Sequence, residues 1–161
     1  MEYLVCVDFE ATCWEHNYKS YDKSDAEIIE FPVVLLNIKS GLIEAEFTHY
    51  VKPTEFPVLS AYCKNLTGIT QADVNNALEI KEVLVRFDEW IQRFIEEKNL
   101  IFENGDDDVK QNAAICTWTD FDVGVYLKGE CERKSIELKS YFNRRIDASV
   151  VFQVVWTNIR V

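Results

Sequence analysis

The sequence predicts a single α/β domain in which helices flank a mixed β-sheet. Three observations lead to this class: apolar runs at residues 3–9, 28–38 and 113–118, a long amphipathic segment at 79–98, and the order in which these follow one another. The chain has 161 residues, of which 48% are hydrophobic and 13% aromatic. A chain of this size and composition can bury one sizeable core. We therefore expect residues 1–161 to form one domain.

The N-terminal runs predict a strand followed by an antiparallel hairpin. Residues 3–9 have the pattern of a short buried strand, and residues 28–38 that of a longer strand rich in branched side chains. Pro32 predicts an irregularity there, as a bulge or an edge segment. After a turn at Ser40 and Gly41, residues 42–51 alternate between apolar and polar. This alternation predicts a third strand paired with the second.

The middle of the chain predicts helices and a returning strand. Ser60 can cap one short helix, and Thr70 with Asp73 forms a capping-box pattern for another. From 79 to 98 apolar residues recur at helical spacing: Ile80, Val83, Leu84, Phe87, Trp90, Ile91, Phe94 and Ile95. A polar turn at 103–108 precedes a strand at 113–118 and a helix at 120–131. A strand reached through a helical crossover is most easily parallel to the first.

Charge and cysteine content limit the class of function. The chain carries 28 acidic and 17 basic residues, a net charge of -11. This balance argues against a surface that holds nucleic acid by phosphate neutralisation alone, so a nucleic-acid partner would be held locally or through metal ions. Five cysteines without a CxxC pair suggest reduced thiols. We find no signal peptide and no membrane-spanning run, and expect a cytoplasmic or nuclear protein.

Two acids stand directly behind the first predicted strand. Residues two apart in a strand point to one face, so Asp8 and Glu10 would place two carboxylates side by side. Such a pair resists burial unless a cation neutralises it, and Mg²⁺ and Mn²⁺ prefer carboxylate ligands. Asp122 follows the strand at 113–118, where a parallel sheet would bring it beside Asp8. Asp120 competes for this position, or caps the following helix instead.

Three segments of the chain resemble the DEDD 3′-to-5′ exonucleases. They are "VDFEATC" (7–13), "LTGITQADV" (66–74) and "TWTDFDVGVYL" (117–127), with "HYVKP" and "LSAYCKNLTGIT" in the expected order between the first and the last. The likeness is greatest to the exoribonuclease subgroup of the DEDDh type that trims histone mRNA, small RNAs and ribosomal RNA ends. It runs from about residue 5 to about residue 148.

The resemblance implies an RNase H-like fold and a metal-dependent exonuclease. It makes Asp8, Glu10 and Asp122 the catalytic acids and the ligands of two Mg²⁺ or Mn²⁺ ions, with Asp122 preferred over Asp120. It places Thr12, Leu66 and Ile69 near the terminal nucleotide, although Leu66 and Ile69 have core packing as an equal alternative. The implied substrates are single-stranded RNA or DNA 3′ ends, from which 5′-nucleotides are released. No membrane partner is implied.

The C-terminal part departs from this pattern. The family has a third motif, a His followed five residues later by an Asp, in which the His deprotonates the attacking water. The two histidines here, His16 and His49, both precede the long helix, and neither has an Asp at that spacing. Asp147 is not assigned as a ligand, and we expect the tail to contain no further helix of the kind that carries the third motif.

We therefore expect a domain shortened at its C-terminal end, through an altered reading frame or a shortened form of the protein, with impaired activity. The alternative is a non-catalytic relative that binds nucleic acid or a protein partner.

Three further features of the sequence have simpler interpretations. Asp106 to Asp108 predict a solvated turn. Trp14, Tyr18 and Tyr21 could stack on bases or pack their own loop. The basic cluster at 139–145 could contact a phosphate backbone.

Overall fold

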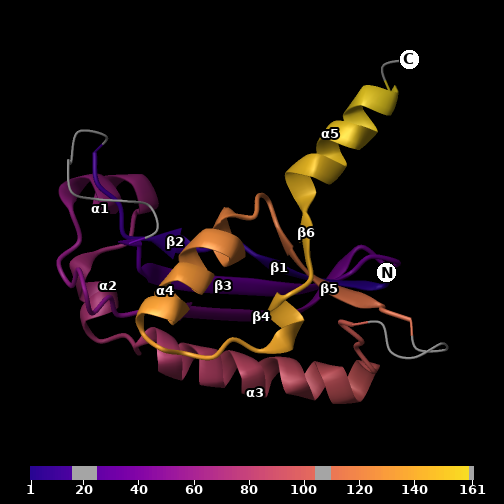
Figure 1. The fold of residues 1–161 in the computed structure, drawn as a ribbon, viewed down its shortest axis with the longest axis horizontal. Coiled ribbons are helices and arrows are strands. Elements are labelled where there is room, and N and C mark those ends of the chain that lie inside the picture. The colour runs from indigo at the N-terminus through magenta and orange to yellow at the C-terminus, as the bar shows by residue number, and fades with distance from the viewer. Residues whose placement is uncertain (16–24, 104–109, 160–161) are drawn as a thin grey trace.

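One mixed β-sheet forms the centre of the computed structural model, which describes residues 1–15, 25–103 and 110–159 (Figure 1). Its strands in the described residues are β1 (Tyr3–Val7), β2 (Glu10–Ala11), β3 (Ile28–Asn37), β4 (Leu42–Tyr50), β5 (Ala113–Thr117) and β6 (Arg145–Asp147). The order is β2-β3-β1-β5-β6, and β4 pairs with β3. β3 runs antiparallel to β1 and β4, whereas β5 runs parallel to β1 and β6. The predicted mixed sheet is confirmed.

The helices follow the predicted order with sharper bounds. They are α1 (Ala61–Thr67), α2 (Gln71–Asn75), α3 (Ile80–Lys98), the π-helix η2 (Phe121–Leu127), α4 (Lys128–Arg133), the 3₁₀-helix η3 (Ser140–Phe142) and α5 (Ala148–Ile159). Ser60 caps α1 by accepting from the N–H of Cys63, and Thr70 with Asp73 forms the predicted capping box of α2. Among the described residues, no helix combines the length and apolarity needed to cross a bilayer.

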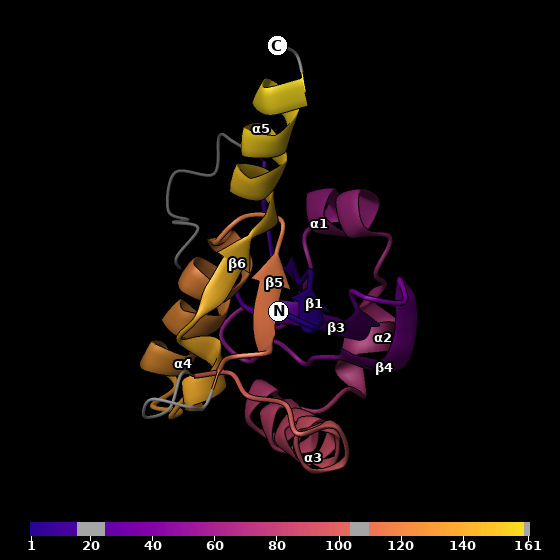
Figure 2. The ribbon, with the colours of Figure 1, turned by 90° about the vertical axis from the view of Figure 1, so that its right-hand side faces the viewer.

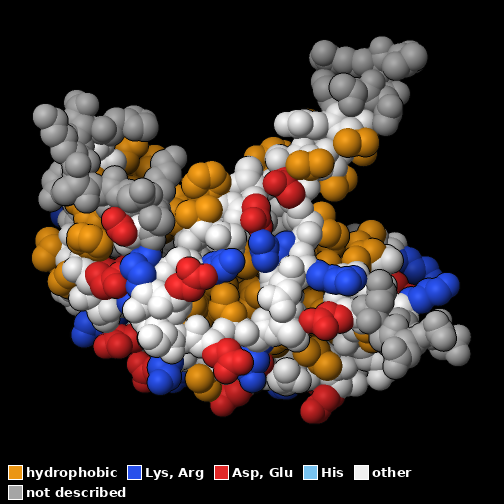
Figure 3. Space-filling view, in the orientation of Figure 1, with side chains coloured by type: hydrophobic (Ala, Val, Ile, Leu, Met, Phe, Trp, Pro, Cys, Tyr) orange, Lys and Arg blue, Asp and Glu red, His pale blue; other side chains and the backbone are white. Residues whose placement is uncertain are grey.

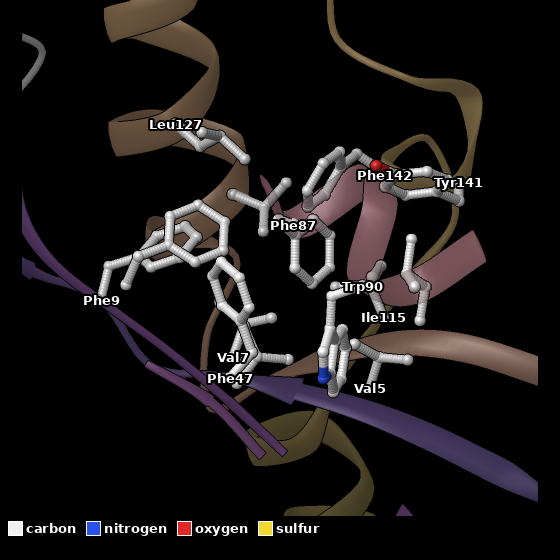
Figure 4. Close-up of a cluster of buried hydrophobic side chains, with 14 of the residues drawn as sticks. Val5, Val7, Phe9, Phe47, Phe87, Trp90, Ile115, Leu127, Tyr141 and Phe142 are labelled. Carbon is white, nitrogen blue, oxygen red and sulfur yellow. The ribbon is translucent and has the colours of Figure 1, made fainter. Parts of the chain in front are cut away.

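The hydrophobic core lies between one face of the sheet and the helices α3, η2 and α4. Phe87 of α3 is completely buried, with its ring centroid 5.4 Å from that of Phe31 and 5.7 Å from that of Phe142. Figure 4 shows Phe87 beside Phe142. The sheet contributes every second residue of β1, Val5 and Val7. This alternation follows from strand geometry, and it turns Leu4 and Cys6 toward the opposite face.

That opposite face of the sheet is less covered. A cavity of about 350 Å³ lies on it, with walls from β1, β3, β4 and β5 and from the start of α5. α5 projects away from the rest of the described chain (Figure 2). Its side chains Val150, Val151, Phe152, Val154 and Val155 are each at least half exposed, and they form the apolar arm in Figure 3. The face opposite the core therefore remains open.

Four expectations about the elements need correction. The first strand ends at Val7 rather than at Phe9. The predicted helix at 120–131 is a π-helix followed by an α-helix. The short strands β2 and β6 were not predicted, and neither was α5, a further helix in the tail. Residues 148–159 contain neither His nor Asp, so α5 does not supply the third motif. α5 is rich in valine, a residue that favours strands, so its sequence pattern does not predict a helix.

Pro32 also behaves differently from the prediction. The pairing of β3 with β4 continues through it, and the register shift falls between Leu35 and Leu36. β1 stops pairing with β3 at Val33, and β2 begins at Glu30. Pro32 therefore lies across from the gap between these two strands, where its missing N–H costs no ladder bond to either.

Candidate functional site

The acids at the end of β1 lie in this gap in the strand pairing. Asp8 is exposed and directly follows β1, Phe9 is buried, and half-buried Glu10 opens β2. Asp122, at the start of η2, is only 7% exposed, and its Oδ1 accepts a hydrogen bond of 2.8 Å from the N–H of Phe9. This bond ties the segment between Asp8 and Glu10 to the helix that follows β5. Two acids that are close in sequence, Asp8 and Glu10, thus lie near Asp122 from a distant part of the chain.

Their electrostatics show that these carboxylates act on one another. Burial raises the pKa of Glu10, and the negative charges of Asp8, Glu30 and Asp122 raise it further. Burial also raises the pKa of Asp122, and the charge of Asp8 adds to this, although the hydrogen bond from Phe9 opposes it. Each raised pKa means that the surroundings disfavour the ionised form. A nearby cation would remove that penalty.

The donor chemistry of this group fits a hard divalent cation, because carboxylate oxygens are the ligands such ions prefer. Within the described residues, however, no three His, Cys, Asp or Glu side chains form a ready-made metal-binding group. Asp8, Glu10 and Asp122 are therefore near neighbours whose oxygens would have to converge on an ion. Their assignment as metal ligands stays a prediction.

Asp120 has a different role from Asp122. Its carboxylate forms a two-point ion pair with Arg145, with an Nε–Oδ1 distance of 2.6 Å and an Nη2–Oδ2 distance of 3.1 Å. Its side chain is 57% exposed and makes no capping hydrogen bond to the helix. Asp120 thus occupies the N-cap position of η2, as suggested, but its side chain does not cap the helix. Its partner Arg145 belongs to the basic cluster noted in the sequence.

The three residues predicted to lie near a nucleotide have different surroundings. Thr12 is 2% exposed, and its Oγ1 accepts a hydrogen bond from the N–H of Glu27. Ile69 is 4% exposed and packs in a small core cluster with Leu59 and Cys63, whereas Leu66 on α1 is 65% exposed. The core-packing alternative thus holds for Ile69 and fails for Leu66. Contact of any of the three with a nucleotide stays a prediction.

A buried ionic network behind Thr12 was not predicted. Glu27 and Glu130 are completely buried, and the ammonium of Lys134 lies 2.7 Å and 2.6 Å from their respective carboxylates. Glu27 also accepts hydrogen bonds from three consecutive backbone N–H groups, those of Thr54, Glu55 and Phe56. The spacing of Glu130 and Lys134, four residues apart on a helix, was a local signal for this pair. Glu27 lacked one, because its partners are distant in sequence.

The same network also organises the loop that packs against the segment after Glu10. The ring of Phe56 contacts that of Trp14 edge-on, at a centroid distance of 5.0 Å. Trp14 therefore packs against the loop that Glu27 organises, which supports the loop-packing interpretation of this residue. Tyr18, Tyr21, His16 and the acids at 106–108 lie outside the described residues.

The remaining candidates lie away from the acids or act structurally. His49 lies on β4, as expected, with its ring 4.9 Å from that of Phe47. Burial and the charge of Arg86 lower its pKa. Asp147 accepts hydrogen bonds from the Oγ of Ser149 and the N–H of Val150, which makes it a cap of α5.

A mixed sheet whose parallel strands β1 and β5 bring acids to one edge, with helices against it, defines the RNase H-like exonuclease fold. Residues 5–153 match the RNase_T family, described as exonuclease, and the chain belongs to this family. Both the fold class and the family resemblance seen in the sequence are confirmed.

Individual relatives agree with this assignment. The chain is 44% identical over 152 residues to the 3′-5′ exonuclease Snipper of Drosophila melanogaster, covering 94% of this chain and 54% of that protein. It is 40% identical over 157 residues to ERI1 exoribonuclease 2 of Danio rerio, covering 96% and 28%. Among solved structures, the nuclease domain of 3′hExo, a DEDDh family member bound to rAMP, matches with a TM-score of 0.80 and 31% identity, covering 97% and 71%. The chain thus spans about half or less of the length of these two curated relatives.

Proposed function

We propose that this chain is a metal-dependent 3′-to-5′ exonuclease that removes 5′-nucleotides from single-stranded RNA ends, or from DNA ends. The observation that carries the proposal is the hydrogen bond between Asp122 and Phe9, which brings three mutually repelling carboxylates together. Membership of an exonuclease family supports the reaction class. The rAMP bound to the similar 3′hExo domain supports RNA as the preferred polymer.

In this proposal Asp8, Glu10 and Asp122 hold two divalent ions. The ions would supply an activated water and stabilise the leaving oxygen of the phosphodiester. Asp122 is held in place by Phe9, so its carboxylate is oriented before substrate arrives. Exposed Leu66 would contact the terminal base or sugar, and buried Thr12 would shape the wall beside it. With a net charge of -11, the chain would depend on this local site to hold RNA.

The proposed activity is slow for this chain. The 161 residues contain no His followed five residues later by an Asp. A positioned general base contributes a factor of about 10² to 10⁴ to the reaction rate. We therefore expect this chain to react more slowly, by such a factor, than a family member that carries the motif.

A non-catalytic function in nucleic-acid binding is the second candidate. The observation that favours it is the position of His49, the one histidine among the described residues, which packs on Phe47 within β4 and faces Arg86. In that case the acids would bind metal and RNA without turnover.

Labelled oligonucleotides distinguish the two candidates. Single-stranded RNA carrying a 5′ label is incubated with the chain and Mg²⁺ or Mn²⁺, in parallel with RNA carrying a 3′ label. A ladder of shortened 5′-labelled products, lost in Asp8→Asn, supports the exonuclease. Binding of RNA in anisotropy without any shortening, even after long incubation in Mn²⁺ at pH 9, would favour the binding function.

A further inference from the structure

Two cysteines from distant parts of the chain face each other across the centre of the sheet. β1 and β5 run parallel, and Cys6 is in register with Cys116. Neighbouring strands lie about 4.8 Å apart, and paired residues project to the same face. This separation falls in the range of about 4.4 to 6.8 Å between Cα atoms that a disulfide requires. Both thiols are free in the structure.

Both thiols also lie on the open face of the sheet. Val5 and Val7 point into the core, so Cys6 between them points to the opposite side, as does Cys116 after Ile115. Cys6 and Cys116 line the cavity of about 350 Å³, together with Asp8 and Trp118. Cys6 is half-buried and Cys116 is 8% exposed. A small oxidant can therefore reach this pair through the cavity.

The side chains of Cys6 and Cys116 influence one another. The Cys6 thiol lowers the pKa of Cys116 to about 7, although burial opposes this. A lowered pKa favours the thiolate of Cys116, which is the nucleophilic form of a thiol. Its partner Cys6 lies opposite it in the strand pair.

The other cysteines are less accessible to an oxidant or lack the strand register, although contact with Cys13 likewise lowers the pKa of Cys63 to about 7. Cys63 is completely buried, and its thiol donates to the carbonyl of Ala11 at 3.7 Å. Cys13 contacts Cys63, but it does not lie opposite it in a strand pair. Cys131 is 1% exposed within the main core, and burial raises its pKa to about 12.

We propose that Cys6 and Cys116 are an oxidative modification site, which a hydroperoxide converts into a disulfide between β1 and β5, beside Asp8. The Cys116 thiolate attacks one peroxide oxygen, so that an S–O bond forms and the O–O bond breaks, and the released hydroxide takes up a proton to become water. The sulfur of Cys6 then attacks the sulfenic sulfur of Cys116, and a second water leaves with the proton of Cys6. Two thiols are oxidised to one disulfide while hydrogen peroxide is reduced to two waters.

Mass spectrometry of the folded, full chain tests this site. The reduced protein is treated with hydrogen peroxide, unfolded, and alkylated with N-ethylmaleimide, and the products are mapped as peptides. We expect two of the five thiols to escape alkylation, a peptide that joins Cys6 to Cys116, and full alkylation after dithiothreitol. Oxidation in guanidinium before mapping serves as the unfolded control, in which this pairing loses its preference.

Single substitutions make the assignment specific. Cys6→Ser and Cys116→Ser should each lower the yield of intramolecular disulfide at least tenfold, whereas Cys63→Ala and Cys131→Ala should leave it unchanged. Cys6→Ser replaces a half-buried thiol, so it stays informative if Cys116→Ser does not fold. Five alkylated thiols after a peroxide dose that oxidises free cysteine would overturn the proposal. A joined peptide of Cys13 with Cys63 in place of the expected one would also overturn it.

Discussion

Asp122 is a single carboxylate that serves both the fold and the proposed chemistry. It is nearly buried, it accepts the N–H of Phe9, and its pKa is raised by burial and by Asp8. A buried carboxylate with a raised pKa destabilises its own protein at neutral pH, because the charged form is the costly one. Natural proteins tolerate such costs most often at functional positions.

We expect Asp122→Asn to separate these two roles. The amide oxygen can still accept from Phe9, and the loss of charge removes repulsion, so the free energy of unfolding should stay equal or rise by about 1 kcal/mol. Mn²⁺ binding measured by calorimetry should weaken at least tenfold. Asp120→Asn is the control, since that side chain pairs with Arg145 and should leave Mn²⁺ binding unchanged. Equal Mn²⁺ affinity in Asp122→Asn and the unaltered chain would remove Asp122 from the metal site.

Leu66 is a second residue whose environment suggests function. A leucine side chain that is 65% exposed contributes little to the core. Leu66→Ala should therefore change the free energy of unfolding by less than about 0.5 kcal/mol, while the affinity for single-stranded RNA in anisotropy falls several-fold. Val58→Ala, at a side chain 74% exposed, is the matched control and should preserve RNA affinity. Identical affinities in both variants would contradict a substrate contact at Leu66.

At the scale of elements, α3 is the helix that the sequence describes best. Its apolar residues repeat at helical spacing, and Ile80, Val83, Phe87, Trp90 and Ile91 are the ones that become buried. The helix begins with a capping box formed by Glu79 and Glu82 and ends at Asn99 in the left-handed conformation, with φ of 52°. Its packing against the sheet is the main source of its stability.

Phe87→Ala should therefore destabilise the protein by about 3 to 5 kcal/mol, the usual cost of deleting a buried aromatic ring. Urea unfolding followed by tryptophan fluorescence measures this loss. Val85→Ala on the same helix, at a side chain 54% exposed, should change the free energy by less than about 0.5 kcal/mol. A loss below about 1 kcal/mol in Phe87→Ala would mean that the core forms elsewhere.

At the scale of the whole molecule, the network of Glu27, Lys134 and Glu130 joins three separate parts of the fold. It links the start of β3, the loop at 54–56 and the end of α4. Burial raises the pKa of Glu27, but hydrogen bonds from Lys134 and from three backbone N–H groups outweigh burial and hold it below 4.5. Burial also raises the pKa of Glu130, and there the contacts with Lys134 and Ile28 only partly compensate.

This network predicts how stability depends on pH. The lowered pKa of Glu27 means that its stabilisation is fully present above its ordinary pKa of 4.5, and is lost as the pH falls below that value. Glu130, with its raised pKa, has the opposite sign and costs stability as the pH rises above 4.5. Glu27→Gln should therefore destabilise the chain at pH 7, and the difference should shrink toward pH 3.

Urea unfolding of both proteins from pH 3 to pH 7 measures that difference. Glu132→Gln on α4, at a side chain 69% exposed, is the control that should follow the unaltered chain at every pH. A constant gap between Glu27→Gln and the unaltered chain over this range would show that the Glu27 charge contributes nothing. Lys134→Met should be the more damaging change, at about 3 to 5 kcal/mol, because it leaves two buried carboxylates without a cation.

The sequence by itself determined the elements that local patterns encode. The hairpin of β3 and β4, the amphipathic α3 and the caps at Ser60 and Thr70 all depend on residues a few positions apart, so their spacing predicts them. Family motifs taken in order predicted that Asp122 lies near Asp8 and Glu10, while its role as a metal ligand stays a prediction. The strands β2 and β6 are too short to show a period, and the valine-rich α5 has the composition of a strand.

Only the tertiary structure decided which side chains meet. Leu66 and Ile69 look equivalent in sequence, yet one is exposed and the other packs against Cys63, because α1 ends between them at Gly68 in the left-handed conformation. Glu27 and Lys134 lie 107 positions apart, Cys6 and Cys116 lie 110 positions apart, and neither pair has a local signature. Burial, ionic pairing and strand register are properties of the folded chain, since each depends on neighbours that are brought together by the sheet.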